Sequence, residues 1–228
     1  VEGYQMELPD DWLKTGLVWE VKKPDKAVEV RFGGRVEEEW TQKGLKTRHE
    51  GYDTVLAVPY DIPVAGYNND TVNTLRLWSA EPMQGEFDFE LFNRGHHMEA
   101  MGPKNGAEVI SQVLYPDDQF EQGRLLRLKQ QYFLVAAGLQ SIIRTFKKKC
   151  IDIGYLDEYI TIQINDTHPT LVIPELMRIL MDEEGLSWDD AWGITTRTIA
   201  YTNHTIMPEA LEKWPVDLFK KLLPRIFR

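Results

Sequence analysis

The sequence predicts an α/β protein that also contains an antiparallel β section. Residues 160–180 read as a strand, a polar turn and a helix, and residues 198–205 repeat the strand and the polar turn. Residues 124–149 carry apolar side chains at intervals of three or four positions, which predicts a long helix with one buried face. Residues 27–80 have the alternation and the turn residues of antiparallel strands. Together these patterns favour helices packed on strands.

The antiparallel section supplies the first predicted strands. Val28, Val30 and Phe32 alternate with charged residues, which predicts a strand with one buried face. Residues 54–58 and 72–78 are two further predicted strands, and the Pro, Gly and Asn residues between them are typical of turns.

Several more helices are predicted from residues that favour helix ends. We expect helices over residues 89–101 and 106–114. Ser187 is a suitable N-cap for the helix that follows it. Pro208 and Pro215 are placed to begin two others, because proline is tolerated in a first helical turn.

The stretch 160–180 is the most informative part of the chain. Its alternating isoleucines predict a buried strand, and Asp166 and His168 follow in a polar turn. Residues 198–202 form a second predicted strand, which ends just before His204. If the two strands run parallel in one sheet, which a right-handed connection through the intervening helices favours, these three side chains are expected at one edge of that sheet, where ligands of open α/β sheets bind.

Three other interpretations of the polar residues remain open from the pattern alone. They can cap helices and satisfy turn backbone. Asp166, His168 and His204 also have the composition of a two-histidine, one-carboxylate metal site. Asp117 and Asp118 are two carboxylates, as in glycoside hydrolases, but adjacent residues rarely face a glycosidic bond from opposite sides.

Composition limits the classes of partner and location. The 228 residues include 26 Lys and Arg against 36 Asp and Glu, a net charge of −10 that disfavours nucleic acid and anionic membranes as partners. Neither a signal peptide nor a membrane-spanning run is recognisable. The single cysteine, Cys150, cannot form an internal disulfide, so we expect a reducing, cytoplasmic location.

Long stretches of this sequence resemble the α-glucan phosphorylases, the family of glycogen, starch and maltodextrin phosphorylases. The resemblance covers nearly the whole chain and includes QINDTHPTLVIPELMRIL, AYTNHTIMPEALEKWP and VLYPDDQF. It implies that residues 1–228 are part of the N-terminal Rossmann-like domain of a two-domain, glycosyltransferase-B-type fold. On this basis we expect the domain to be incomplete at both ends and the C-terminal pyridoxal phosphate-binding domain to be absent.

The resemblance also implies roles for individual residues. His204 matches the histidine of the family whose side chain reaches a sugar hydroxyl and whose neighbouring carbonyl assists at the reacting sugar. Asp118 and Gln119 match the acidic loop that gates the catalytic cleft, although the family often has Asn where Gln119 stands. Asp166, His168 and Thr205 match residues that line the pocket beside the glucose site.

The activity implied by the resemblance is reversible phosphorolysis of α-1,4-glucans, which gives glucose 1-phosphate. Its cofactor is pyridoxal phosphate, and its cofactor lysine and basic phosphate site have no match in this chain. The expected partners are therefore the glucan, phosphate, the missing C-terminal domain and, in the parent enzyme, a second copy that forms a homodimer. The rival interpretation is a stand-alone, non-catalytic module that is either carbohydrate-binding or structural.

Overall fold

The computed structural model describes residues 19–41, 44–83, 89–96, 102–114, 116–208 and 211–228. The chain divides into two compact units. The first consists of Val1–Val30 and Thr54–Gln130, and the second of Arg31–Asp53 and Gln131–Arg228. Mixed helices and strands with antiparallel sheets fit the predicted α/β class. Among the described residues, no helix has the length and apolar character that a membrane span requires.

A four-stranded sheet forms the centre of the first unit. Its strands are β1 (Val21–Lys22), β2 (Val28–Phe32), β5 (Asp53–Ala65) and β6 (Val72–Glu81). Strand β5 lies between β1 and β2, and it also pairs antiparallel with β6. The 3-10 helix η1 (Pro24–Lys26) connects β1 to β2. The alternation predicted in β2 is confirmed, because its three apolar side chains are buried and its two charged ones are exposed.

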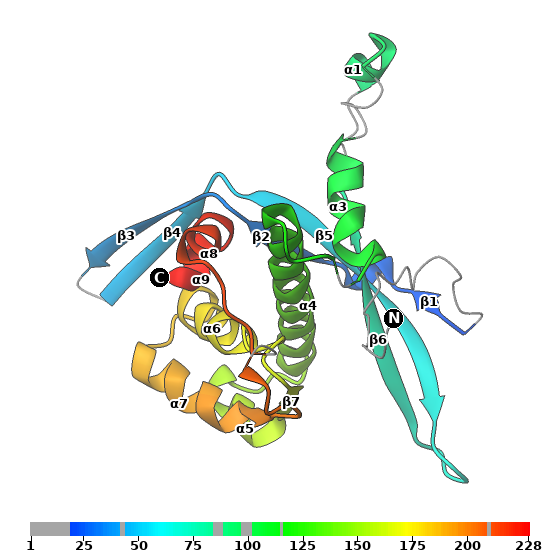
Figure 1. The fold of residues 1–228 in the computed structure, drawn as a ribbon. Coiled ribbons are helices and arrows are strands. Elements are labelled where there is room, and N and C mark those ends of the chain that lie inside the picture. The colour runs from blue at the N-terminus through cyan, green and yellow to red at the C-terminus, as the bar shows by residue number, and fades with distance from the viewer. Residues whose placement is uncertain (1–18, 42–43, 84–88, 97–101, 115, 209–210) are drawn as a thin grey trace. The chain divides into compact units, whose positions relative to one another are not determined.

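The β5–β6 hairpin extends beyond the sheet as a two-stranded ribbon (Figure 1). Its turn depends on Asn69, whose side-chain oxygen accepts a hydrogen bond from the backbone N–H of Thr71 at 2.8 Å. Within the sheet, Arg76 of β6 donates to both carboxylate oxygens of Asp61 on β5, at 2.6 and 2.7 Å. This pairing holds the pKa of Asp61 below its usual value, since the effect of the guanidinium outweighs that of burial.

Two helices of the first unit differ from their predicted bounds. Helix α3 (Gly102–Gln112) begins earlier than expected and packs on β6, where the Ser111 hydroxyl accepts a hydrogen bond from the Ala80 N–H at 2.8 Å. Helix α1 is Phe89–Asn93, so the prediction of a helix to residue 101 is wrong at residues 94–96, and residues 97–101 lie outside the described part. Gly95 ends α1 because its φ of 88° allows the N–H of His96 to donate to the carbonyl of Leu91.

The long predicted helix is confirmed as α4 (Glu121–Lys147), which crosses from the first unit into the second. Five of the side chains in its predicted apolar stripe are buried, while Leu125 and Ile142 are half-buried. The five buried residues are Leu128, Tyr132, Val135, Leu139 and Phe146.

The second unit contains the predicted strand–turn–helix pattern. The short helices η2 (Ile153–Tyr155) and α5 (Leu156–Tyr159) come first. Strand β7 (Ile162–Asn165) follows and leads into helix α6 (Val172–Arg178). Helix α6 continues as the π-helix η3 (Ile179–Glu183). Helix α7 (Trp188–Thr198) then precedes strand β8 (Ile199–Thr202). The expected parallel pairing is confirmed, since Ile162 to Asn165 align with Ile199 to Thr202.

The remaining elements of the second unit are a hairpin and two terminal helices. Strands β3 (Arg35–Thr41) and β4 (Gly44–Glu50) pair antiparallel, and α9 (Pro224–Phe227) packs against β3. Pro215 precedes α8 (Val216–Leu222), as predicted. The helix predicted to begin at Pro208 starts there with 3-10 geometry, residues 209–210 lie outside the described part, and the backbone of residues 211–215 is not helical.

A buried polar network joins α4 to α6 within the second unit. Glu175, which is 1% exposed, accepts a hydrogen bond from the Tyr132 hydroxyl at 2.8 Å and two from the Arg178 guanidinium at 2.8 and 2.9 Å. Burial, reinforced by the Glu175 charge, raises the pKa of Tyr132. Burial alone lowers the pKa of Arg178, but the Glu175 carboxylate outweighs it and raises that pKa.

Three consecutive acidic residues after α6 pair with cations of other elements or of this network. Asp182 accepts two hydrogen bonds from Arg225 of α9, both at 2.7 Å. Glu183 pairs with Arg178, and Glu184 pairs with Lys147 at the end of α4. The last two residues of the π-helix and the residue after it thus each face a different cation.

Candidate functional site

Asp166 directs the chain out of strand β7. Its φ is 59°, a left-handed conformation that Asp tolerates better than most residues. Its N–H donates to the carbonyl of Thr202 at 2.8 Å, which extends the parallel ladder by one bond beyond Asn165. The local reversal therefore begins where the two strands end together.

The Asp166 side chain joins the tips of the two strands. Its Oδ1 atom accepts a hydrogen bond from the backbone N–H of His204 at 2.8 Å. Asp166 is half-buried and His204 is exposed, so the imidazole remains open to solvent while its backbone is fixed. The expectation that Asp166 and His204 meet at one edge is confirmed.

The residues after Asp166 contact a segment further along the chain. Thr167 accepts a hydrogen bond at its hydroxyl from the N–H of Glu212, at 3.0 Å. Nε2 of His168 lies 3.6 Å from Oε1 of Glu212, whose side chain is 10% exposed while that of His168 is 50% exposed. The structure thus adds Glu212 to this group. Glu212 lies in the stretch AYTNHTIMPEALEKWP, but it follows no predicted strand, so the sequence pattern did not single it out.

Thr205 follows His204 in a turn built from side-chain hydrogen bonds. The N–H of Thr205 donates to Oδ1 of Asn203 at 3.2 Å, and the N–H of Met207 donates to the Thr205 hydroxyl at 3.2 Å. Thr205 is half-buried, whereas the neighbouring Ile206 is 99% exposed. These bonds satisfy backbone N–H groups that no sheet partner serves here.

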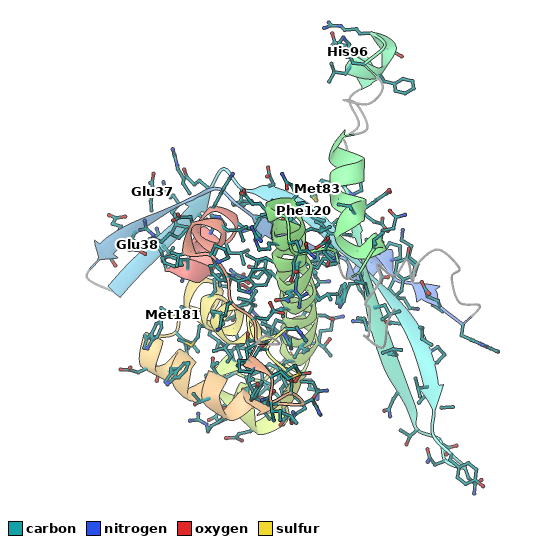
Figure 2. The ribbon with its side chains drawn as sticks, in the orientation of Figure 1. Glu37, Glu38, Met83, His96, Phe120 and Met181 are labelled. Atoms are coloured by element: carbon teal, nitrogen blue, oxygen red, sulfur yellow. The ribbon has the colours of Figure 1, made fainter. Side chains whose placement is uncertain are left out.

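Asp118 and Gln119 lie in a loop of the first unit, before α4. The Gln119 N–H donates to Oδ1 of Asp117 at 2.9 Å, and both Asp118 and Gln119 are exposed. Arg124 donates to the carbonyls of Asp118 and Gln119 at 3.0 and 3.2 Å, while Arg127 lies 3.5 Å from the Asp118 carboxylate. Figure 2 labels Phe120, the last residue of this loop, whose side chain is 64% exposed.

The predicted site residues therefore form two groups. Asp166, His168, His204 and Thr205 gather at the ends of β7 and β8 in the second unit, with Glu212 beside them. Asp118 and Gln119 form the separate loop of the first unit. Within the described residues, no three His, Cys, Asp or Glu side chains are arranged to hold a metal ion.

The second-unit group can hold a neutral polyhydroxyl ligand more readily than an anion. It offers two carboxylates, two imidazoles and a hydroxyl, which accept and donate hydrogen bonds in the way that sugar hydroxyls require. The carboxylates of Asp166 and Glu212 disfavour a phosphate on Coulombic grounds. This donor set does not fit the phosphate group of pyridoxal phosphate.

Comparison with known proteins identifies the family. The chain is 52% identical over 227 residues to glycogen phosphorylase of Bacillus subtilis, which covers 100% of this chain. It is 53% identical to the brain form of Homo sapiens and 52% identical to the muscle form of Ovis aries, which cover 99% and 98% of it. The chain spans 27% of the length of each of these relatives. The family model described as carbohydrate phosphorylase matches residues 1–228, so the chain belongs to the carbohydrate phosphorylase family.

Proposed function

We propose that this chain is the sugar-side part of the N-terminal domain of an α-1,4-glucan phosphorylase, which releases glucose 1-phosphate by phosphorolysis. The observation that carries the proposal is the hydrogen bond from the His204 N–H to Asp166, which joins two parallel strand tips. Membership of the carbohydrate phosphorylase family supports the reaction class. Glycogen phosphorylases at 52–53% identity support the glucan as substrate.

Each group has a role in this proposal. His204 binds a hydroxyl of the reacting glucose through its exposed imidazole, while Asp166 holds its backbone. His168 and Thr205 line the adjoining pocket, and Glu212 is added to them by its place beside His168. Asp118 and Gln119 contribute from the acidic loop, whose backbone Arg124 supports.

The remaining parts of the reaction belong, in this proposal, to polypeptide outside this chain. Phosphorolysis brings anionic phosphate to the glycosidic bond, and anions require cationic neighbours. The second-unit group carries two carboxylates and is therefore negative rather than cationic. We accordingly assign the phosphate site, pyridoxal phosphate and the cofactor lysine to a C-terminal domain. We also infer that residues 1–228 belong to a Rossmann-like domain of glycosyltransferase-B type, that the complete enzyme is a cytoplasmic homodimer, and that nucleic acid is not a partner.

A chimera tests the proposal directly. This chain replaces the matching segment of the Bacillus subtilis relative, and release of glucose 1-phosphate from glycogen and phosphate is measured. The chimera is expected to be active. His204→Ala is expected to lower the rate constant by about 100-fold, because hydroxyl contacts at a reacting sugar strengthen in the transition state. His96→Ala, at an exposed histidine of the first unit, is the control and should change the rate less than about twofold.

The rival function is a stand-alone carbohydrate-binding or structural module. Calorimetric titration of the isolated chain with maltoheptaose separates it from the proposed one. If the chain holds only the sugar-side part of a larger cleft, it should bind maltoheptaose weakly. Few contacts then offset the entropy that the sugar loses on binding. Micromolar binding by the isolated chain, or a His204→Ala chimera with an unchanged rate, would favour the rival.

A further inference from the structure

Thr167 has two structural roles in the turn between β7 and α6. Its carbonyl accepts hydrogen bonds from the hydroxyl and the N–H of Thr170, at 2.7 and 3.3 Å, which stabilise the turn itself. Its hydroxyl accepts the N–H of Glu212 at 3.0 Å, across 45 residues of sequence. A single half-buried side chain thus connects this turn to a distant segment.

The segment that follows β8 is held to this turn at two points. Asp166 accepts the N–H of His204 at one end, and Thr167 accepts the N–H of Glu212 at the other. Asp166 and Thr167 are consecutive, so one short turn fixes both ends. The first point fixes the backbone of His204, and the second fixes the backbone of Glu212.

The second point determines what His168 faces. The Glu212 carboxylate lies 3.6 Å from Nε2 of His168, and its side chain is 10% exposed. The hydrogen bond to Thr167 fixes the point of the backbone from which the Glu212 side chain starts. The burial of that side chain then restricts the directions its carboxylate can take. The Thr167 hydroxyl therefore influences the His168 imidazole indirectly, through the position of Glu212.

We propose that Thr167 is a positioning residue of the sugar-side site, which acts by holding Glu212 beside His168. The inference rests on the proposed function, because it gives the glucan as the ligand that the positioned pair serves. Thr167 itself touches neither reacting atoms nor sugar in this proposal. Thr167 is therefore expected to affect how tightly the glucan binds before reaction, which KM reports, and not the rate of the chemical step, which kcat reports.

The test uses the chimera with two substitutions of similar size. Thr167→Val keeps the branched shape and loses the hydroxyl, and Thr167→Ser keeps the hydroxyl. Valine is expected to raise the KM for glucan about fivefold, the usual effect of one hydrogen bond, and to change kcat less than about twofold. Serine should restore KM to within about twofold of the original value.

Thr145→Val is the matched control. The Thr145 hydroxyl donates to the carbonyl of Ser141 on the exposed side of α4, far along the chain from the turn. Both KM and kcat should stay within about twofold of their original values in this variant. A purely structural role for Thr167 would lower the active fraction and hence kcat with KM unchanged, and that result overturns the proposal.

A double-mutant cycle asks whether Thr167 acts through Glu212. Glu212→Gln removes the charge and retains the main-chain hydrogen bond, so it should raise the KM for glucan by itself. Adding Thr167→Val to Glu212→Gln should raise KM less than about twofold further, because the two changes act on one contact. Multiplicative effects of the two substitutions would overturn the proposal.

Amide hydrogen exchange gives a readout that does not depend on activity. In the chimera, the peptide containing Glu212 should lose protection in Thr167→Val and retain it in Thr167→Ser. An inactive chimera with this pattern refutes the proposed function and supports the positioning of Glu212. Unchanged protection in Thr167→Val overturns the positioning, whatever the activity.

Discussion

Gly123 lies in the first turn of α4, against the acidic loop. A Cβ atom at this position would lie 1.7 Å from the Asp117 carbonyl oxygen, so the loop can pack on the helix only if the residue is glycine. In an exposed helix, Gly→Ala is ordinarily stabilising by up to about 1 kcal/mol. The sign of this substitution therefore reports on the loop.

Gly123→Ala is expected to lower the free energy of unfolding by about 1–3 kcal/mol, as overpacked sites do. Denaturant unfolding of the chain measures it. Gly138→Ala is the control on the same helix, because nothing lies within 4 Å of the added Cβ atom, and it should stabilise by about 0.5–1 kcal/mol. A stabilising effect at both positions would show that the loop does not lie on the helix as described.

The Asp61–Arg76 pair makes stability depend on pH. Since its folded pKa is below the unfolded value of 3.8, the pair stabilises the fold above that value and stops doing so as the pH falls through the lowered pKa. Asp61→Asn should therefore lower the free energy of unfolding by about 1–2 kcal/mol near neutral pH, and by progressively less below about pH 4.

A second cross-strand pair is the control for this measurement. Arg35 and Glu50 also face each other on antiparallel strands, but their side chains are 72% and 39% exposed, against 24% and 15% for Arg76 and Asp61. Glu50→Gln should cost less than about 0.5 kcal/mol at every pH. An effect of Asp61→Asn that is constant between pH 3 and 7 would contradict the pKa shift.

At the scale of the element, the position of α6 depends on the buried Glu175. Tyr132→Phe removes one of its three donors and keeps the ring, which contacts Phe32 at 5.9 Å between centroids. We expect a loss of about 1–2 kcal/mol in the free energy of unfolding. Glu175→Ala should cost about 3–5 kcal/mol, because it leaves the partly buried Arg178 without its main partner. Chemical denaturation followed by tryptophan fluorescence compares the two variants, and equal losses would contradict this ranking.

The elements that carry the site were predictable for a physical reason. Strand β7 and its turn are specified by alternating β-branched residues followed by polar ones, and strand β8 by a short β-prone run that also ends in polar residues. The predicted end of α1 was wrong because a left-handed glycine, Gly95, ends the helix earlier. The π-helical turn after α6 left no pattern that periodicity detects.

At the scale of the whole molecule, sequence alone predicted the α/β class and the convergence of Asp166 with His204. It could not predict Glu212, because its contact with His168 arises from a segment that returns after 44 residues without a strand or helix of its own at that point. The buried Glu175 was missed for a related reason. A carboxylate on a helix reads as solvent-facing until its partners on other helices are known.

The parallel pair β7–β8 has a consequence for the isolated chain. In the part that the structure describes, it forms a two-stranded sheet, so each strand has an outer edge of backbone groups without a neighbouring strand. Parallel strands are ordinarily interior members of wider sheets. These open edges are templates onto which further strands can add, either from additional polypeptide or from other copies in concentrated solution.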